Sequence, residues 1–100
     1  MGNTNETMEI AETATHLELT LKGHTDNVNA VAITPDGNRV LSAGRDRTVR
    51  LWHLATGRQE TTLEGHTGSV DAVAVSPDGR RIVSAGSDNH QVLVWALRFL

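Results

Sequence analysis

The stretch that decides the fold occurs twice. It first reads Leu21-Lys22-Gly23-His24-Thr25, followed by Pro35-Asp36-Gly37 and Ser42-Ala43-Gly44, and it returns as Leu63-Glu64-Gly65-His66-Thr67, followed by Pro77-Asp78-Gly79 and Ser84-Ala85-Gly86. The two copies are 42 residues apart, and 16 of 26 positions are identical between residues 21–46 and 63–88. That identity is far above chance for unrelated segments, so the chain contains an internal repeat.

Each copy contains the same series of short apolar runs separated by turn residues. The run at 28–33 is almost continuously apolar, which is typical of a strand buried on both faces. Pro35-Asp36-Gly37 suits a tight turn, because proline presets φ and glycine accepts a positive φ. Leu17, Leu19 and Leu21 alternate with polar residues, which is the period of a half-exposed strand. The sequence therefore predicts an all-β chain with strands at 15–21, 28–33, 39–43, 48–54, 59–63, 70–75, 81–85 and 91–97.

The composition argues against several classes of protein. A chain of 100 residues permits one modest domain, and no apolar run approaches the ~18–20 residues that span a bilayer. The net charge of −3 provides no basic surface for nucleic acid. There is no cysteine, so disulfides, thiolate ligands and a thiol nucleophile are excluded. No secretion signal is visible, and a cytoplasmic location is expected.

Repeats of this length, with Gly-His near the start and tryptophan near the end, resemble the WD-repeat family of β-propellers. The resemblance covers roughly residues 15–97, although His53 and Ala96 stand where the aspartate of the family name follows tryptophan. It implies two four-stranded antiparallel blades, blade one at 22–63 and blade two at 64–100. Residues 1–14 are polar and acidic, and we expect them to form a flexible tail.

The order of the strands predicts that blade two takes its outer strand from another chain. Blade two contains three strands, and an extra outer strand lies at 15–21, where Leu17, Leu19 and Leu21 alternate. In the family, an N-terminal strand at this position completes the last blade, which is called a velcro closure. Two blades cannot close a ring, so we expect a homo-oligomer, with eight blades from four chains favoured over six from three. The alternative is a split or decayed fragment that completes the propeller of a partner WD-repeat protein.

Serine, histidine and aspartate recur in each repeat and allow two interpretations. A hydrolase triad needs an exposed nucleophile, a cleft and oxyanion donors, and a single active site does not require two copies. In the WD-repeat family, the matching residues and a tryptophan form a buried hydrogen-bonded tetrad. The resemblance thus implies structural tetrads of His24, Ser42, Asp46 and Trp52 in blade one, and of His66, Ser84, Asp88 and Trp95 in blade two. We predict a non-enzymatic scaffold, with a Ser/His/Asp hydrolase as the second alternative.

The remaining polar residues predict a binding surface rather than a metal or cofactor site. No histidine pair has ligand spacing to carboxylates, and the Pro-Asp-Gly turns lack the further acidic ligands of a calcium loop. Asp88 to Trp95 is one residue longer than Asp46 to Trp52, which predicts a longer turn or a bulge at 89–91. In the family, two sets of turns share a face on which protein or peptide partners dock. The matching residues here are Asp26, Asn27, Arg45, Arg47, Ser69, Ser87, Asn89 and His90, unless they are merely solvated turn residues.

Overall fold

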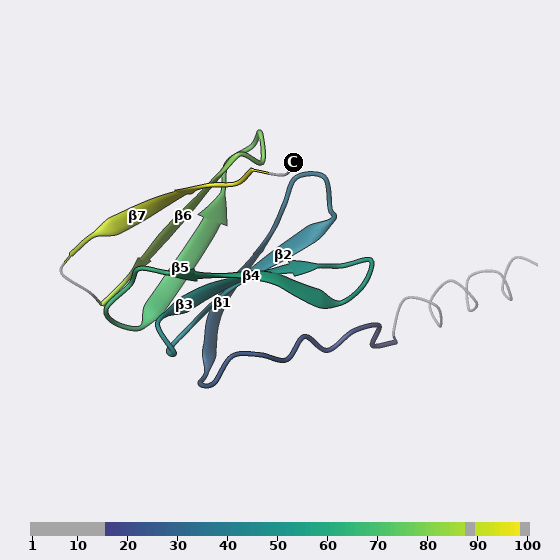
Figure 1. The fold of residues 1–100 in the computed structure, drawn as a ribbon, viewed down its shortest axis with the longest axis horizontal. Coiled ribbons are helices and arrows are strands. Elements are labelled where there is room, and N and C mark those ends of the chain that lie inside the picture. Colours follow the sequence, from purple (N-terminus) through teal and green to yellow (C-terminus); the bar gives the residue numbers. More distant parts are fainter. Residues whose placement is uncertain (1–15, 88–89, 99–100) are drawn as a thin grey trace, which may run out of the picture.

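The computed structural model describes residues 16–87 and 90–98, which form two antiparallel sheets packed against one another (Figure 1). The first sheet, blade one, has the order β1-β2-β3-β4, with β1 at Val28–Ile33, β2 at Arg39–Gly44, β3 at Thr48–His53 and β4 at Arg58–Glu64. The second sheet, blade two, has the order β5-β6-β7, with β5 at Val70–Val75, β6 at Arg81–Gly86 and β7 at Val92–Ala96. The described residues contain no helix.

The seven strands lie within one residue of the positions that the hydrophobic pattern predicts. The exception is the strand expected at 15–21, because residues 17–21 carry no strand and Thr15 lies outside the described residues. This segment runs beside blade one and pairs with neither sheet (Figure 1). A strand is stabilised only where a neighbouring edge supplies hydrogen bonds, and this segment occupies no such edge within the chain.

Each first hairpin is closed by the turn chemistry that proline, aspartate and glycine provide. The N–H of Gly37 donates to the carbonyl of Thr34 at 2.8 Å, and Gly37 has φ +75°. Asp36 holds the turn by accepting hydrogen bonds from the Thr34 hydroxyl at 2.7 Å and from the N–H of Asn38 at 2.9 Å. Gly79 repeats the positive φ at +72° in blade two. In the turn before β7, His90 has φ +57°, as Arg47 has φ +73° in the turn before β3, and Asp88 and Asn89 lie outside the described residues.

Each blade presents two different apolar faces, because successive side chains of a strand point to opposite sides. The aliphatic face is defined in blade one by Leu41, Ala43, Val49 and Leu51, and the matching residues of blade two are Val83, Ala85, Val92 and Val94. The tryptophan face is defined in blade one by Val31, Ile33, Val40 and Trp52, and the matching residues of blade two are Val73, Val75, Ile82 and Trp95. Along each strand, successive side chains point alternately to the aliphatic face and to the tryptophan face.

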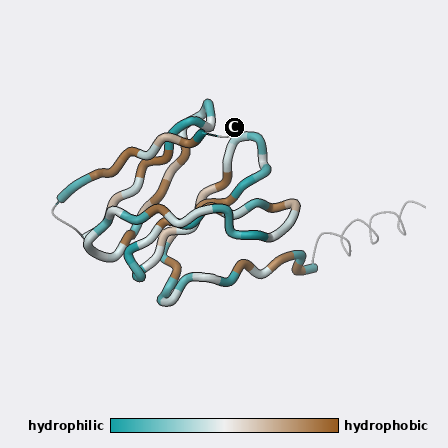
Figure 2. Tube along the Cα trace, in the orientation of Figure 1, coloured by the Kyte–Doolittle hydropathy of each residue, from teal (hydrophilic) through white to brown (hydrophobic). Residues whose placement is uncertain are grey.

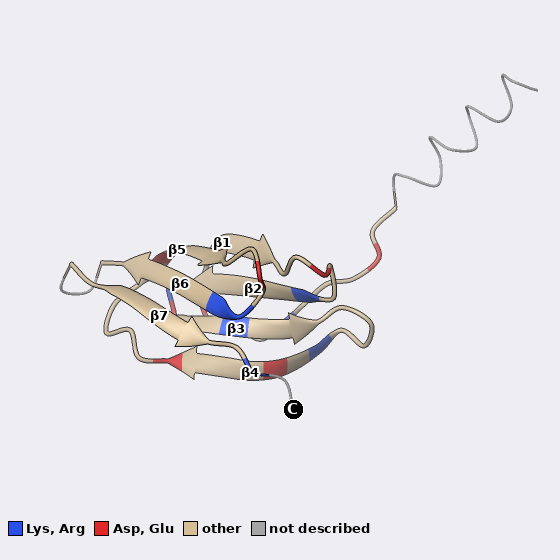
Figure 3. Ribbon diagram, turned by 90° about the horizontal axis from the view of Figure 1, so that it is seen from above, with Lys and Arg blue, Asp and Glu red and all other residues tan. Residues whose placement is uncertain are grey.

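The core lies where the aliphatic face of blade one packs on the tryptophan face of blade two. Its fully buried members are Leu41, Ala43, Val49, Leu51, Val70 and Ile82, and Trp95 packs against them. Most strands are mainly hydrophobic, whereas the turns and β4 are mainly polar (Figure 2). Charged residues avoid this interface; β4 carries several of them, whereas β7 carries none (Figure 3). With aromatic residues at only 3% of the chain, the core is aliphatic.

Candidate functional site

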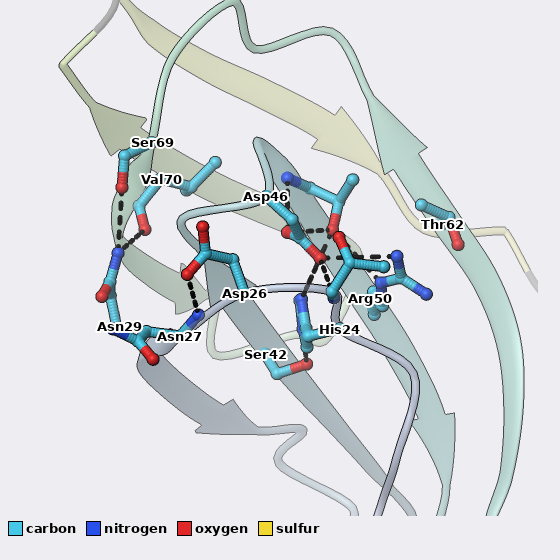
Figure 4. Close-up of polar contacts among 12 residues, drawn as sticks. His24, Asp26, Asn27, Asn29, Ser42, Asp46, Arg50, Thr62, Ser69 and Val70 are labelled. Atoms are coloured by element: carbon cyan, nitrogen blue, oxygen red, sulfur yellow. Dashed lines mark hydrogen bonds and ion pairs between the residues drawn. The ribbon is translucent and has the colours of Figure 1, made fainter.

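In blade one, three of the four predicted tetrad residues meet around one hydroxyl group. The indole N–H of Trp52 donates to Oγ of Ser42 at 2.8 Å, and Nε2 of His24 lies 2.6 Å from the same oxygen. Nδ1 faces the Asp46 carboxylate, which can only accept, so the neutral ring carries its proton on Nδ1 and its Nε2 accepts from the Ser42 hydroxyl. Nδ1 lies 2.9 Å from Oδ2 of Asp46, so His24 bridges the serine and the aspartate (Figure 4).

Asp46 is a buried carboxylate with several hydrogen-bond donors. The Thr48 hydroxyl donates to it at 2.7 Å, and the N–H groups of Thr25 and Thr48 donate at 3.1 and 3.2 Å. The Arg50 guanidinium lies 3.4 Å away. Burial by itself raises the pKa of Asp46, but the bonds from Thr48, Thr25 and His24 outweigh it and lower that pKa to about 2. The carboxylate is therefore ionised throughout the physiological pH range.

Blade two contains the same arrangement in its described part. The indole N–H of Trp95 donates to Oγ of Ser84 at 2.8 Å, and Nε2 of His66 lies 2.7 Å from that oxygen. Asp88, the fourth predicted member, lies outside the described residues. His66 and Ser84 are buried. Since Ser84 is on the tryptophan face that packs on blade one, this network lies under the contact between the blades.

The geometry suits a structural role better than a catalytic one. Ser42 is buried, and its oxygen is engaged by both Trp52 and His24, so it is not presented to a substrate. A cavity of about 760 Å³ lies elsewhere, lined by Asp36, Asp78, Arg81 and neighbouring residues of the opposite turns. Among residues 16–87 and 90–98, no three histidine, aspartate or glutamate side chains are placed to hold a metal ion.

The predicted partner-binding residues lie at the same end of both blades. The N–H of Arg45 donates to the carbonyl of Asn27 at 2.9 Å, and the N–H of Ser87 donates to the carbonyl of Ser69 at 3.0 Å. These bonds join the turn before the first strand of each blade to the turn after its second strand. Arg45, Arg47, Asp26, Asn27, Ser87 and His90 are exposed, Ser69 is half-buried, and Asn89 lies outside the described residues.

Sequence reasoning missed Asn29, which links the two blades at this end. Its Nδ2 donates to Oγ of Ser69 and to the carbonyl of Val70, both at 3.0 Å (Figure 4). It also missed Thr48 and Arg50 as partners of Asp46. An aspartate followed two residues later by a threonine, as at Asp46 and Thr48, is a weak turn signal that the sequence contains. The contact of Asn29 depends on how the blades pack, which no local pattern indicates.

Comparison with known proteins identifies the family. The family profile described as "WD domain, G-beta repeat" matches residues 15–53 and 57–96, which is most of the chain. The chain therefore belongs to the WD-repeat family. The solved structure of U3-55K superposes with a TM-score of 0.72 at 28% identity, covering 76% of this chain and 25% of that one. The fold is thus that of WD-repeat propeller blades.

Three curated relatives match this chain over about one repeat each. Residues of this chain are 54% identical over 39 positions to an uncharacterized WD repeat-containing protein of Synechocystis, 50% over 38 to the protein groucho of Drosophila melanogaster, and 49% over 43 to the small ribosomal subunit protein RACK1z of Arabidopsis thaliana. The matches cover 38%, 38% and 43% of this chain and 11%, 5% and 13% of the respective relatives. The chain thus matches only a small part of each relative.

The class of protein follows from the family. WD-repeat proteins are generally scaffolds without enzymatic activity, and their fold is typical of proteins that bind other proteins. In the part of the chain that the structure describes, no helix has the length and apolarity needed to span a bilayer.

The tetrad generates a prediction about Ser42. Replacing Ser42→Ala removes the acceptor of the Trp52 indole and the donor to His24, which leaves two buried groups unpaired. We expect a loss of about 1–3 kcal/mol in the free energy of unfolding, measured by urea denaturation at fixed protein concentration. The control is Ser87→Ala in an exposed turn, which should change the free energy by less than about 0.5 kcal/mol. Equal effects of the two substitutions would contradict a structural role for the tetrad.

The lowered pKa of Asp46 predicts how the free energy of unfolding changes at acid pH. Its pKa is about 2 in the folded chain, against 3.8 for an ordinary aspartate, so its contribution is complete above pH 3.8 and is lost as the pH falls through about 2. The shift of nearly two pKa units corresponds to roughly 2 kcal/mol. Unfolding free energies measured from pH 6 to pH 2 should fall more steeply for the natural chain than for Asp46→Asn. Asp36 and Asp78 also have lowered pKa values, through bonds from Thr34 and Ser76, and they titrate in both proteins. Parallel curves would refute the role of Asp46.

Proposed function

We propose that this chain is a non-enzymatic WD-repeat scaffold that assembles with copies of itself into a closed β-propeller and binds a protein or peptide partner on the turn-lined end of the ring. The proposed assembly has four copies and eight blades, and three copies with six blades is the alternative ring. Its proposed location is the cytoplasm. The observation that carries the proposal is the match between the two outward faces of the chain.

The aliphatic face is buried on blade one and exposed on blade two. Leu41, Val49 and Leu51 of blade one are buried by contact with blade two. Their repeat counterparts Val83, Val92 and Val94 are exposed, the last two by 61% and 62%. Valine side chains in such a row are rarely left in water without a covering surface. Blade two therefore presents outward the same kind of surface that blade one uses inside the chain.

Apart from its tryptophans, the tryptophan face shows the reverse distribution. On blade two, Val70 and Ile82 are fully buried, and Val73 and Val75 pack against the core. Their counterparts on blade one are Val28, Val40, Val31 and Ile33, and Val31 and Ile33 are exposed by 66% and 57%. The outward face of blade one thus matches the surface that blade two uses inside the chain. A second copy can stack its blade one on blade two of the first copy through the contact already present within each chain.

A contact that joins different faces of identical chains is head-to-tail, and it closes into a ring when the rotation divides the circle. Because each chain contributes two blades, the ring has an even number of blades. Known propellers have roughly four to eight blades, a range that includes the proposed rings of four and of three copies. Folding and association are then coupled, so stability rises with protein concentration.

The proposed partner surface is the end of the ring that carries the exposed turn residues. Arg45 and Arg47 are exposed there, and arginine is enriched at positions that dominate binding energy. Repetition of the chain repeats these arginines around the ring. A displayed peptide library selected on the assembled natural chain tests this surface. Recovered peptides should lose at least about ten-fold in affinity for Arg45→Glu/Arg47→Glu, and peptides that bind this variant equally well would place the partner site elsewhere.

The assembly is tested by absolute mass in solution, using light scattering and native mass spectrometry. The natural chain should have four times its 10.8 kDa, or three times for the smaller ring. Val31→Asp places a charge in the proposed contact between copies and should give the mass of a single chain, because burying an unpaired carboxylate costs several kcal/mol.

The matched control is Ala55→Asp, which adds the same charge in an exposed turn between β3 and β4 and should retain the mass of the natural chain. A folded natural chain at 10.8 kDa that stays so at high concentration would overturn the assembly. If that single chain instead formed mixed complexes with another WD-repeat protein, it would be a fragment that completes a partner.

A further inference from the structure

We infer that the cavity between the Pro-Asp-Gly turns of the two blades binds an acidic peptide segment of a protein partner, and that Arg80 and Arg98 hold its carboxylates. The cavity lies at the end of the blades opposite the turns that carry Arg45 and Arg47, so this site is additional to the proposed partner surface. Both of its walls belong to one chain, and the inference therefore needs no assembly between copies.

The cavity has a volume of about 760 Å³ and is formed where three segments meet at one edge of the molecule (Figure 1). Its walls come from the β1–β2 turn, from the β5–β6 turn and from the end of β7 with the residues that follow it. Gly79 has φ +72°, and a Cβ atom added there would lie 3.6 Å from Cδ of Pro35, so the two turns approach each other closely. The packing of the two blades thus creates this cavity, and neither blade contains it alone.

Positive charge gathers around this cavity. Arg80, Arg81 and Arg98 line it, which is a third of the nine basic residues in a chain whose net charge is −3. All three are exposed and make no ion pair with a described residue, whereas the half-buried Arg39 and Arg50 of blade one are both paired. A cleft lined by cations attracts and concentrates anions. Because Arg81 is the counterpart of Arg39, the charges that blade two adds are Arg80 and Arg98.

The backbone at these two added arginines is the same in both blades, but the charge is not. The N–H of Leu97 donates to the carbonyl of Arg80 at 2.7 Å, which holds the next residue, Arg98, close to Arg80. In blade one the equivalent bond of 2.9 Å ends on the carbonyl of Asn38, and Ala55 stands in the place of Arg98. The fold therefore does not require two cations here. Neighbouring guanidinium groups repel each other, and an anion bound between them would relieve that repulsion.

Two aspartates limit how much negative charge the cavity accepts. Asp36 and Asp78 also line it, and each accepts hydrogen bonds through Oδ1 from a hydroxyl and a backbone N–H of its own turn. These bonds lower the pKa of both carboxyls, so both are ionised near neutral pH. Against three arginines, the two aspartates leave one net positive charge. That balance favours a carboxylate over a doubly charged phosphate.

The shape of the cavity favours a segment of chain over a small molecule. Pockets for small molecules usually enclose most of the ligand within apolar walls. Here the arginines, Pro35 and Ala96 are exposed, so the walls cover only one side of a ligand. Pro35, Ala96 and Leu97 offer apolar contacts beside the guanidinium groups, which bind carboxylates through paired hydrogen bonds. The surface therefore suits a peptide in which acidic and aliphatic side chains are mixed.

A rhodamine-labelled hexapeptide that alternates glutamate and leucine tests this site, with fluorescence anisotropy measured on the natural chain. We expect saturable binding of one peptide per chain that weakens at high salt, and little binding when glutamine replaces glutamate in the peptide. Arg80→Asn/Arg98→Ala gives blade two the residues of blade one and should weaken binding about five- to thirty-fold, because two charged contacts are lost. The urea midpoint of this variant should be that of the natural chain.

The matched control is Lys22→Gln/Arg58→Gln, which removes two positive charges from exposed positions outside the cavity and should change the affinity by less than about two-fold. Equal losses in the two double variants would show that binding follows net charge, and they would overturn the site. No binding of the acidic peptide, or no loss with Arg80→Asn/Arg98→Ala, would overturn it as well.

Two further measurements identify the ligand and its place. A hexapeptide with phosphoserine in place of glutamate should bind no more tightly than the acidic one, and binding about ten-fold tighter would overturn the preference for carboxylates. Loss of the acidic peptide only in Arg45→Glu/Arg47→Glu would place it at the other end of the blades and overturn the cavity as its site. None of these results depends on the mass of the natural chain, so the proposed assembly stands or fails separately.

Discussion

The packing of an aliphatic face on a tryptophan face is the contact on which the rest of this structure depends. Leu41, Val49 and Leu51 of blade one are buried in this contact. A sheet has two faces, and burying one of them against a neighbour leaves the other outward. In repeat proteins, stability is approximately the sum of the repeats and of the contacts between neighbours. The stability of such a blade therefore increases with the number of its faces that neighbouring blades cover.

The polar networks make that contact specific. Ser84 and His66 are buried beneath the interface, where an unpaired hydroxyl or imidazole would cost stability. The bond from Trp95 to Ser84 and the contact of Ser84 with His66 satisfy the Ser84 hydroxyl and Nε2 of His66. In blade one the same network extends to Asp46, which also holds the turn before β3 through Thr48. These side chains connect the segment before β1, strand β2 and the β2–β3 turn. The connections hold the blade in a fixed shape where it contacts its neighbour.

The two blades differ most at their outer edges. β4 closes blade one with a charged strand, and its ion pair to Arg39 and its hydrogen bond to Arg50 are satisfied within the chain. β7 ends blade two, in the described residues, with an apolar edge. Strand β7 differs from its counterpart β3 as well, because blade two has Leu93 at the place that Arg50 occupies in blade one.

Local chemistry made much of this protein predictable from its sequence. Apolar runs of Val, Ile, Leu and Ala between turn residues predicted seven strands to within one residue. The Pro-Asp-Gly segments predicted where the first hairpins close. Both predictions succeeded because φ preferences and side-chain period act over a few residues. The recurrence of His24, Ser42, Asp46 and Trp52 indicated a network through a family resemblance. Only the tertiary structure decided that residues 17–21 form no strand within the chain, that Asn29 links the blades, and which apolar faces are covered. These features depend on which sheet edges and faces meet in space, and a repeat pattern that is the same in both blades does not contain that information.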